Sequence, residues 1–202
     1  MLSTPPLVPE LRLHLATEIT PLWQASEAHL EKIGLPPPFW AFAWVGGQAL
    51  ARWLLDNPEA VRGRRALDFG CGGGIVAIAA MRAGAAVAIA ADMDAVALTA
   101  CRLNAAANGV AVETALGDAT ASTPDADPIL VGDVCYERGM SERITGWLGA
   151  QAASGRTVLL GDPGRTFLPQ DRLERIASYT VPTSRELEDR TARETGVWRL
   201  RA

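Results

Sequence analysis

Short apolar segments alternate with longer segments of helical periodicity through residues 65–161. The apolar segments predict strands, and the segments between them predict helices. The strands are expected over residues 65–68, 84–92, 110–116, 129–131 and 156–161, and the helices over residues 75–82, 95–108 and 141–153. Because strands that alternate with helices build a parallel sheet with helices on both faces, the pattern predicts an α/β fold.

The N-terminal residues carry a different pattern. Leucines alternate with polar residues over residues 10–16, which predicts a short half-buried strand. Residues 23–32 predict a helix after Pro21. An aromatic cluster at residues 38–44 then leads into another helix, which is expected to end near Asp56.

The C-terminal residues predict a final helix over residues 171–178, followed by two strands over residues 179–185 and 195–201. The polar residues 186–194 between these strands are predicted to be a solvent-exposed connection. The two strands would then form an antiparallel hairpin at the end of the sheet.

Length and composition favour one domain. The chain has 202 residues, of which 49% are hydrophobic, and this is enough for one buried core. We expect a single domain over residues 1–202, with an N-terminal helical cap in residues 1–60 and a Rossmann-like core in residues 61–202. The net charge of −4 gives no general attraction to nucleic acid. The apolar residues 75–91 include Arg82 and Gly84, so we expect no membrane span.

The cysteines and histidines predict no metal site and no disulfide framework. Cys71, Cys101 and Cys135 lack metal-type spacing, and their odd number favours reduced thiols. His14 and His29 have no acidic cluster at ligand spacing. Because residues 1–9 lack the pattern of a secretory signal, we expect a cytoplasmic protein.

The most informative stretch is Ala66-Leu67-Asp68-Phe69-Gly70-Cys71-Gly72-Gly73-Gly74. Glycines between a strand and a helix let the backbone turn sharply and approach a ligand, while the helix start offers free N–H groups. The dinucleotide pattern G-x-G-x-x-G is incomplete, because Ile75 stands at its third glycine. Asp68 would repel a pyrophosphate but attract the ammonium and sulfonium of S-adenosylmethionine. The charges therefore favour S-adenosylmethionine.

Further residues complete the predicted cofactor site. Asp92 ends the second strand, where a carboxylate can accept hydrogen bonds from a ribose, and this fits either cofactor. Asp118 follows the third strand and is either an acceptor for an adenine amino group or an ordinary turn residue. The tryptophans are explained mainly by core packing, although Trp44 with Gly46 and Gly47 could form a cavity wall. We include the adjoining residues Cys71 and Met93 among the predicted cofactor-binding residues.

With these motifs the chain resembles the seven-strand protein lysine methyltransferases, most closely those of the electron transfer flavoprotein β subunit. The resemblance covers nearly the whole chain and rests on four stretches. They are the aromatic and glycine residues 38–50 with residues 54–58, the D-x-G-x-G-x-G loop, Gly132-Asp133-x-x-Tyr136 and Gly161-Asp162-Pro163-Gly164-Arg165. Val45 departs from the family, which tends to have proline there.

The resemblance implies a Rossmann-like, seven-stranded class I S-adenosylmethionine-dependent methyltransferase fold. It implies that S-adenosylmethionine, and its product S-adenosylhomocysteine, are held by Trp44, the loop of Gly70, Cys71 and Gly72, Asp92, and the region of Asp118 and Gly132. It also implies that Asp133 and Tyr136 face the substrate lysine. We expect Asp133 to orient the ammonium and the Tyr136 ring to pack on the alkyl stem. An alternative for Asp133 is capping of the following helix.

The expected substrate is the electron transfer flavoprotein β subunit, bound by a monomer that uses neither nucleic acid nor a membrane. The alternatives are methylation of a ribosomal protein, or of a small-molecule or nucleobase amine, on the same fold. A nucleotide-binding regulator without catalysis and an NAD-dependent reductase also remain open.

Overall fold

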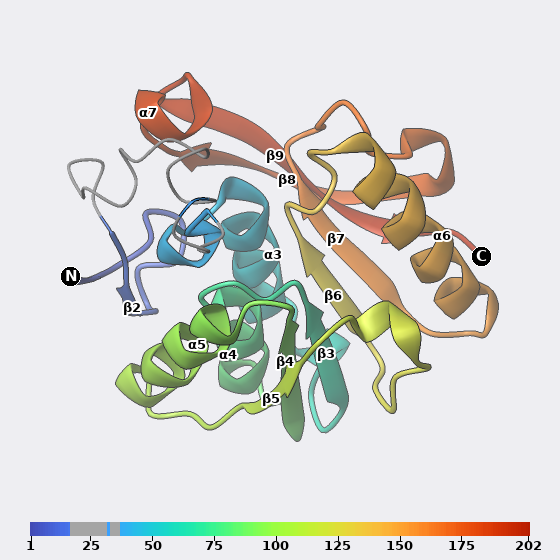
Figure 1. Ribbon diagram of the computed structural model, residues 1–202, viewed down its shortest axis with the longest axis horizontal. Coiled ribbons are helices and arrows are strands. Elements are labelled where there is room, and N and C mark those ends of the chain that lie inside the picture. The colour runs from blue at the N-terminus through green and yellow to red at the C-terminus, as the bar shows by residue number, and fades with distance from the viewer. Residues whose placement is uncertain (17–31, 33–36) are drawn as a thin grey trace.

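The computed structural model describes residues 1–16, 32 and 37–202 (Figure 1). The helix predicted over residues 23–32 therefore lies outside the described residues, apart from its last position. Within the described part of the chain, no helix is long and apolar enough to cross a bilayer.

A seven-stranded sheet forms the centre of the molecule, as the sequence predicts. Its strands are β3 (Arg65–Phe69), β4 (Val87–Asp92), β5 (Glu113–Leu116), β6 (Ile129–Gly132), β7 (Val158–Asp162), β8 (Leu173–Pro182) and β9 (Ala192–Leu200), in the order β5-β4-β3-β6-β7-β9-β8. The first five strands are parallel, whereas β9 is antiparallel to both β7 and β8. The predicted α/β class and the terminal antiparallel hairpin are both confirmed.

Helices cover both faces of the sheet (Figure 1). On one side lie α3 (Val45–Asp56), α4 (Ile75–Arg82) and α5 (Ala95–Ala107), and on the other lies α6 (Arg138–Ala153). Successive strand residues point to opposite faces. In β7, Leu159 joins the core under α3, whereas Val158 and Leu160 join the core under α6. This continuous apolar character is typical of a strand buried on both sides.

The remaining elements are short. They are β1 (Leu2–Ser3), β2 (Leu13–His14), α7 (Arg185–Glu188) and the 3-10 helices η1 (Phe39–Ala41), η2 (Pro58–Ala60), η3 (Ala119–Ala121) and η4 (Gln170–Arg172). The strand predicted over residues 10–16 is reduced to β2. Side chains of α5, and not a longer run of strand pairing, bind the backbone of this segment. Asn104 accepts from the His14 N–H at 2.7 Å. The Arg12 N–H similarly donates to Asn108, the C-cap of α5, at 2.9 Å.

The helix predicted over residues 171–178 is wrong. Residues 173–178 belong to the edge strand β8, which pairs with β9 from Leu173 to Pro182, with an irregularity between Arg175 and Ala177. Leucine, glutamate, arginine and alanine favour helices locally, but pairing with β9 supplies the backbone hydrogen bonds of the whole segment. Asp171 and Arg172, the first two residues of the predicted helix, belong to η4.

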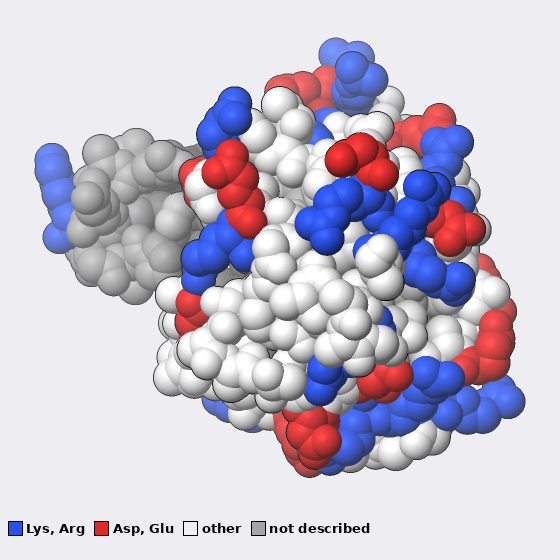
Figure 2. Space-filling view, turned by 90° about the vertical axis from the view of Figure 1, so that its right-hand side faces the viewer, with Lys and Arg blue, Asp and Glu red and all other residues white. Residues whose placement is uncertain are grey.

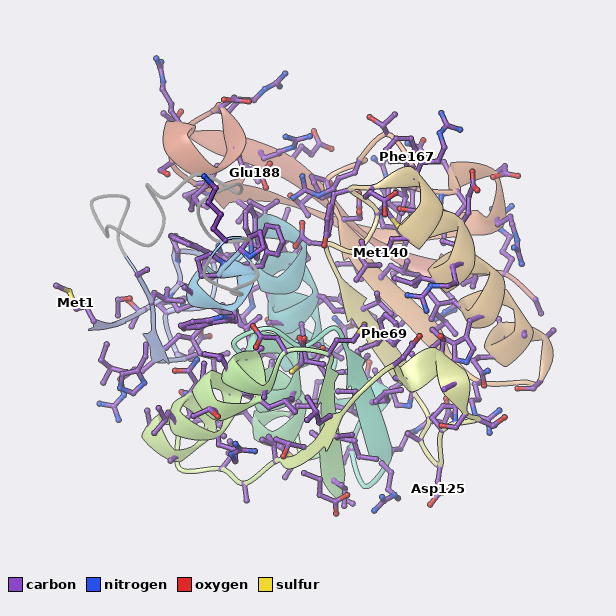
Figure 3. The ribbon with its side chains drawn as sticks, viewed as in Figure 1. Met1, Phe69, Asp125, Met140, Phe167 and Glu188 are labelled. Atoms are coloured by element: carbon purple, nitrogen blue, oxygen red, sulfur yellow. The ribbon has the colours of Figure 1, made fainter. Side chains whose placement is uncertain are left out.

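The connection predicted to be solvent-exposed over residues 186–194 also differs. It begins inside α7, and the Glu188 side chain at the end of this helix is buried, only 3% exposed. Glu188 lies on the side of α7 that faces the body of the protein (Figure 3). A buried carboxylate requires cationic partners, and these belong to the candidate site described next.

Candidate functional site

A cavity of about 460 Å³ opens at the carboxyl ends of β3, β4 and β6, a volume typical of small-ligand sites. In an open α/β sheet this is where ligands bind. All eleven residues expected at the site line this one cavity, namely Trp44, Asp68, Gly70, Cys71, Gly72, Asp92, Met93, Asp118, Gly132, Asp133 and Tyr136. The sheet therefore brings together residues that are far apart in the sequence.

The glycine loop between β3 and α4 adopts the backbone conformation that its sequence predicts. Gly70, Gly72 and Gly74 have φ angles of 64°, 50° and 83°, in the left-handed region that favours glycine. A Cβ on Gly73 would lie 2.8 Å from the Trp40 carbonyl oxygen. The loop is tied to the next strand, because the Cys71 N–H donates to the Ala91 carbonyl at 3.0 Å. Apart from Cys71, it thus presents backbone without side chains to the cavity.

Asp92 holds this loop in place. One carboxylate oxygen accepts from the Gly72 N–H at 2.9 Å, and the other accepts from the Asp94 N–H at 3.0 Å. An ionised carboxylate can accept about four hydrogen bonds, so Asp92 keeps acceptor capacity that a ligand can use.

Asp68 lies on the cavity wall and is only 2% exposed. Its carboxylate accepts from the Ala77 N–H in the first turn of α4 at 2.9 Å. Burial raises the pKa of Asp68 to about 7, although the hydrogen bond from Ala77 lowers it. A cation in the cavity would favour the ionised form, since an opposite charge lowers a carboxyl pKa.

Asp118 has the turn role that the sequence left open, although it also lines the cavity. Its carboxylate accepts from the Thr120 N–H at 2.9 Å and from the Thr120 hydroxyl at 2.7 Å, and so caps η3. The other oxygen pairs with Arg143. The hydrogen bonds from Thr120, followed by Arg143, lower the pKa of Asp118.

Aromatic rings surround the cavity mouth. The Phe39 ring centroid lies 6.0 Å from that of Trp44 and 5.7 Å from that of Tyr136. The Trp44 indole N–H donates to the Phe39 carbonyl at 2.8 Å, which fixes its ring. Phe39 and Tyr136 are 42% and 49% exposed, and Met93 is 70% exposed. The mouth therefore offers apolar surface to a partner from solvent.

Asp133 is held by two other elements. One of its oxygens accepts from the Gly47 N–H in the first turn of α3 at 2.9 Å, and the other accepts from Arg165 at 2.9 Å. Capping of the following helix is therefore wrong, because Glu137 caps α6 through the N–H groups of Gly139 and Met140. Burial raises the pKa of Asp133 to about 6, against the opposing effect of Arg165.

Close backbone contacts set the start of α3 against the sheet. A Cβ on Gly46 would overlap the Gly161 carbonyl oxygen and would lie 2.6 Å from Asp133. A Cβ on Gly132 would lie 3.1 Å from the Cα of Gly47. Val45 occupies the first helical position of α3 and is 1% exposed. Proline is common at this position because its fixed φ suits a helix start, but it is not required there. The α3 helix accordingly begins at Val45.

The sequence marked the Gly161–Arg165 turn without giving Arg165 a role, and it missed Glu188, which lies behind Arg165. Asp162 accepts from the N–H groups of Gly164 and Arg165 at 2.8 and 2.7 Å, which directs the turn after β7 toward Asp133. Arg165 lines the cavity and also donates to Glu188 at 2.8 Å. The Gly-Asp-Pro-Gly-Arg turn was a signal for Arg165, whereas nothing in the polar run distinguished Glu188.

Among the described residues, no three His, Cys, Asp or Glu side chains are grouped so that they could hold a metal ion. Cys71, Cys101 and Cys135 are all buried free thiols.

Comparison with known proteins identifies the family. The chain is 37% identical over 200 residues to the electron transfer flavoprotein beta subunit lysine methyltransferase of Danio rerio, covering 96% of this chain and 76% of that protein. It is 34% identical over 209 residues to the Homo sapiens protein of the same name, covering 97% and 76%. The chain belongs to the electron transfer flavoprotein β-subunit lysine methyltransferase family.

The family assignment agrees with the fold. A family model described as ribosomal protein L11 methyltransferase (PrmA) matches residues 51–132. The ribosomal protein L11 methylase structure from Lactobacillus delbrueckii subsp. bulgaricus has a TM-score of 0.55 at 20% identity, over 79% of this chain and 80% of that chain. Magnesium protoporphyrin IX methyltransferase from Synechocystis PCC 6803 with bound SAM has a TM-score of 0.56 at 17% identity, over 77% and 78%. The class I methyltransferase fold is confirmed.

Proposed function

We propose that this protein transfers methyl groups from S-adenosylmethionine to lysine side chains of the electron transfer flavoprotein β subunit. The observation that carries the proposal is that Asp133 and Tyr136 line the same cavity as the glycine loop. The named activity of the Danio rerio and Homo sapiens relatives supports the substrate. Both alignments span nearly the whole chain, so they cover the glycine loop as well as the segment with Asp133 and Tyr136.

The cavity fits S-adenosylmethionine. The loop from Gly70 to Gly74 has no side-chain cation for a pyrophosphate, and Asp68 adds a buried carboxylate to its wall. When bound, the cofactor supplies an electrophilic methyl group on a positively charged sulfur. Asp68 would hold the amino acid end of the cofactor, and Asp92 would accept from the ribose.

The other cofactor residues would shape the cavity around these two acids. Gly70, Cys71 and Gly72 let the backbone approach the ligand, and Gly132 leaves room beside α3. Trp44, Met93 and Asp118 would enclose the ligand from the sides. This enclosure would hold the cofactor in one orientation, so that an incoming amine can approach its methyl group in line.

The lysine must lose a proton before it can react, because its ordinary pKa is about 10.4. The rings of Tyr136 and Phe39 would pack on the alkyl stem at the mouth of the cavity. Asp133 would then orient the nitrogen. Because the pKa of Asp133 is about 6, far below that of lysine, it remains ionised at neutral pH, and the lysine proton leaves to solvent.

A protein substrate agrees with the charge of the surface. Acidic and basic side chains are interspersed on the face shown in Figure 2, without the broad basic surface that binds a nucleic acid backbone. The match to the L11 methyltransferase model ends at Gly132, before Asp133 and Tyr136. It therefore supports binding of S-adenosylmethionine but gives no support for a ribosomal substrate. A cytoplasmic monomer completes the proposal.

Intact-mass analysis tests the proposal. The purified flavoprotein β subunit is incubated with enzyme and S-adenosylmethionine, and ribosomal protein L11 is treated in parallel. We expect mass increments of whole methyl groups on the β subunit, at lysines identified by peptide mapping. Asp133→Ala is expected to bind S-adenosylhomocysteine but to lose methylation. Methylation of L11 alone would contradict the proposed substrate.

A further inference from the structure

Four side chains of alternating charge form a chain that ends in the cavity. Arg165 donates through one nitrogen to both Asp133, at 2.9 Å, and Glu188, at 2.8 Å. Glu188 in turn accepts from Arg193 at 2.9 Å. These residues come from the end of β6, the turn after β7, helix α7 and strand β9, so elements distant in sequence meet here.

The inner members of this chain are buried. The side chains of Asp133 and Glu188 are 8% and 3% exposed, and that of Arg165 is 18% exposed. Asp133 and Arg165 line the cavity, whereas Glu188 does not. Among the described residues, the hydrogen bond from Arg165 connects Glu188 to the cavity wall.

Buried ion pairs contribute little net stability compared with apolar side chains of similar size. A charge-assisted hydrogen bond, however, restricts the orientation of the carboxylate that accepts it, and the shared Arg165 nitrogen links Asp133 to Glu188. The neighbouring Asp162 reinforces this orientation, since its carboxylate fixes the backbone N–H of Arg165.

We propose that Arg165 is a positioning residue for lysine methylation, which holds the Asp133 carboxylate toward the substrate amine, and that Glu188 anchors Arg165. The inference rests on the proposed function and extends it to the terminal hairpin. Arg165 keeps Asp133 both oriented and ionised, while Glu188 keeps the guanidinium from turning into the cavity.

The charged and titratable groups around Asp133 determine what a variant should change. Arg165 faces it from the turn after β7 and Asp162 from the end of β7. Cys135 and Tyr136 lie on its own loop, and Glu188 and Arg193 stand behind Arg165. The Gly47 N–H contacts it from α3. Loss of Arg165 removes the main group that lowers the Asp133 pKa, so Asp133 would remain protonated to a higher pH.

The test compares full-length variants in steady-state methylation of the flavoprotein β subunit, with calorimetric binding of S-adenosylhomocysteine as the measure of an intact cavity. For Arg165→Gln we expect kcat to fall about tenfold or more, with the cofactor affinity unchanged. The acidic limb of its kcat profile should move up by about one pH unit or more. Arg165→Lys keeps the charge and should restore the position of that limb.

Glu188→Gln is matched by Glu194→Gln, an exposed carboxylate on β9 that lies 3.9 Å from Arg175. We expect Glu188→Gln to lower kcat several-fold without moving the acidic limb upward, while Glu194→Gln behaves as the wild type. If Arg165→Gln fails to fold, a lower kcat of Glu188→Gln relative to Glu194→Gln still supports the inference. Equal kcat values for these two variants, or a wild-type pH profile for folded Arg165→Gln, would overturn it. An inactive wild type would instead refute the proposed function.

Discussion

Gly46 at the start of α3 and Gly161 at the end of β7 meet backbone to backbone, so that a Cβ on either residue would overlap the carbonyl oxygen of the other. This contact sets α3 close enough to the sheet for the Gly47 N–H to reach Asp133. The close contact between Gly46 and Gly161 therefore helps to position the Asp133 carboxylate in the cavity.

Gly46→Ala should destabilise the protein, because the added methyl group meets backbone that cannot move aside. Overpacking of this kind costs about 1–3 kcal/mol in the free energy of unfolding. The matched control is Gly146→Ala in α6, where a Cβ meets nothing within 4 Å. This control should stabilise the protein by about 0.5–1 kcal/mol, since alanine favours a helix. Urea unfolding of both variants checks the prediction, and equal unfolding midpoints would contradict it.

Asp92→Ala should weaken the binding of S-adenosylhomocysteine. The substitution frees the Gly72 N–H and removes the proposed acceptor for the ribose. We expect the Kd to rise about tenfold or more, which corresponds to about 1.4 kcal/mol. Asp125→Ala is the control, because Asp125 is fully exposed and lies away from the cavity (Figure 3). An unchanged Kd for Asp92→Ala in calorimetry would exclude the ribose role.

Asp68 should make the free energy of unfolding fall as pH rises from about 4 to about 7. Its pKa is about 7 in the folded protein and near its ordinary value of 3.8 in the unfolded chain, so the folded state holds the extra proton in this range. Asp68→Asn keeps an acceptor for the Ala77 N–H but cannot titrate. Denaturant unfolding across this pH range should give a flatter profile for the variant. Parallel profiles would show that Asp68 does not titrate there.

Tyr136 should act through its ring. Tyr136→Phe keeps the contact with Phe39 and should retain most of the methylation rate. Tyr136→Ala removes the surface proposed to hold the lysine stem, and we expect kcat/KM to fall about tenfold or more. Initial rates with the flavoprotein β subunit distinguish the two variants. A loss as large in Tyr136→Phe would assign the role to the hydroxyl group.

The sequence predicts the parallel part of the fold well because its signals are local. The helix at Ile75–Arg82 has the predicted bounds, and the glycines before it adopt the positive φ angles that their spacing indicates. The residues that line the cavity could also be predicted, since the carboxyl ends of parallel strands share one edge of the sheet.

The terminal hairpin was harder to predict because its structure depends on partners distant in sequence. Residues 171–178 carry helical propensity, yet residues 173–178 become a strand through pairing with β9. Glu188 stands in a polar run, and its burial becomes evident only in the folded structure, where its side chain contacts Arg165 and Arg193. The same applies to Asp133, whose partners Gly47 and Arg165 lie on two other elements.

The place of β9 inside the sheet, between β7 and β8, has a consequence for the order in which the protein can assemble. Residues 65–132 are contiguous and can form the four parallel strands β3 to β6 and the glycine loop while synthesis is still under way. The part of the cavity proposed to bind lysine can form only after residue 200 has been synthesised, because β7 pairs with β9 on its outer side. The cofactor-binding part of the cavity is thus complete in the nascent chain before the part that binds the protein substrate.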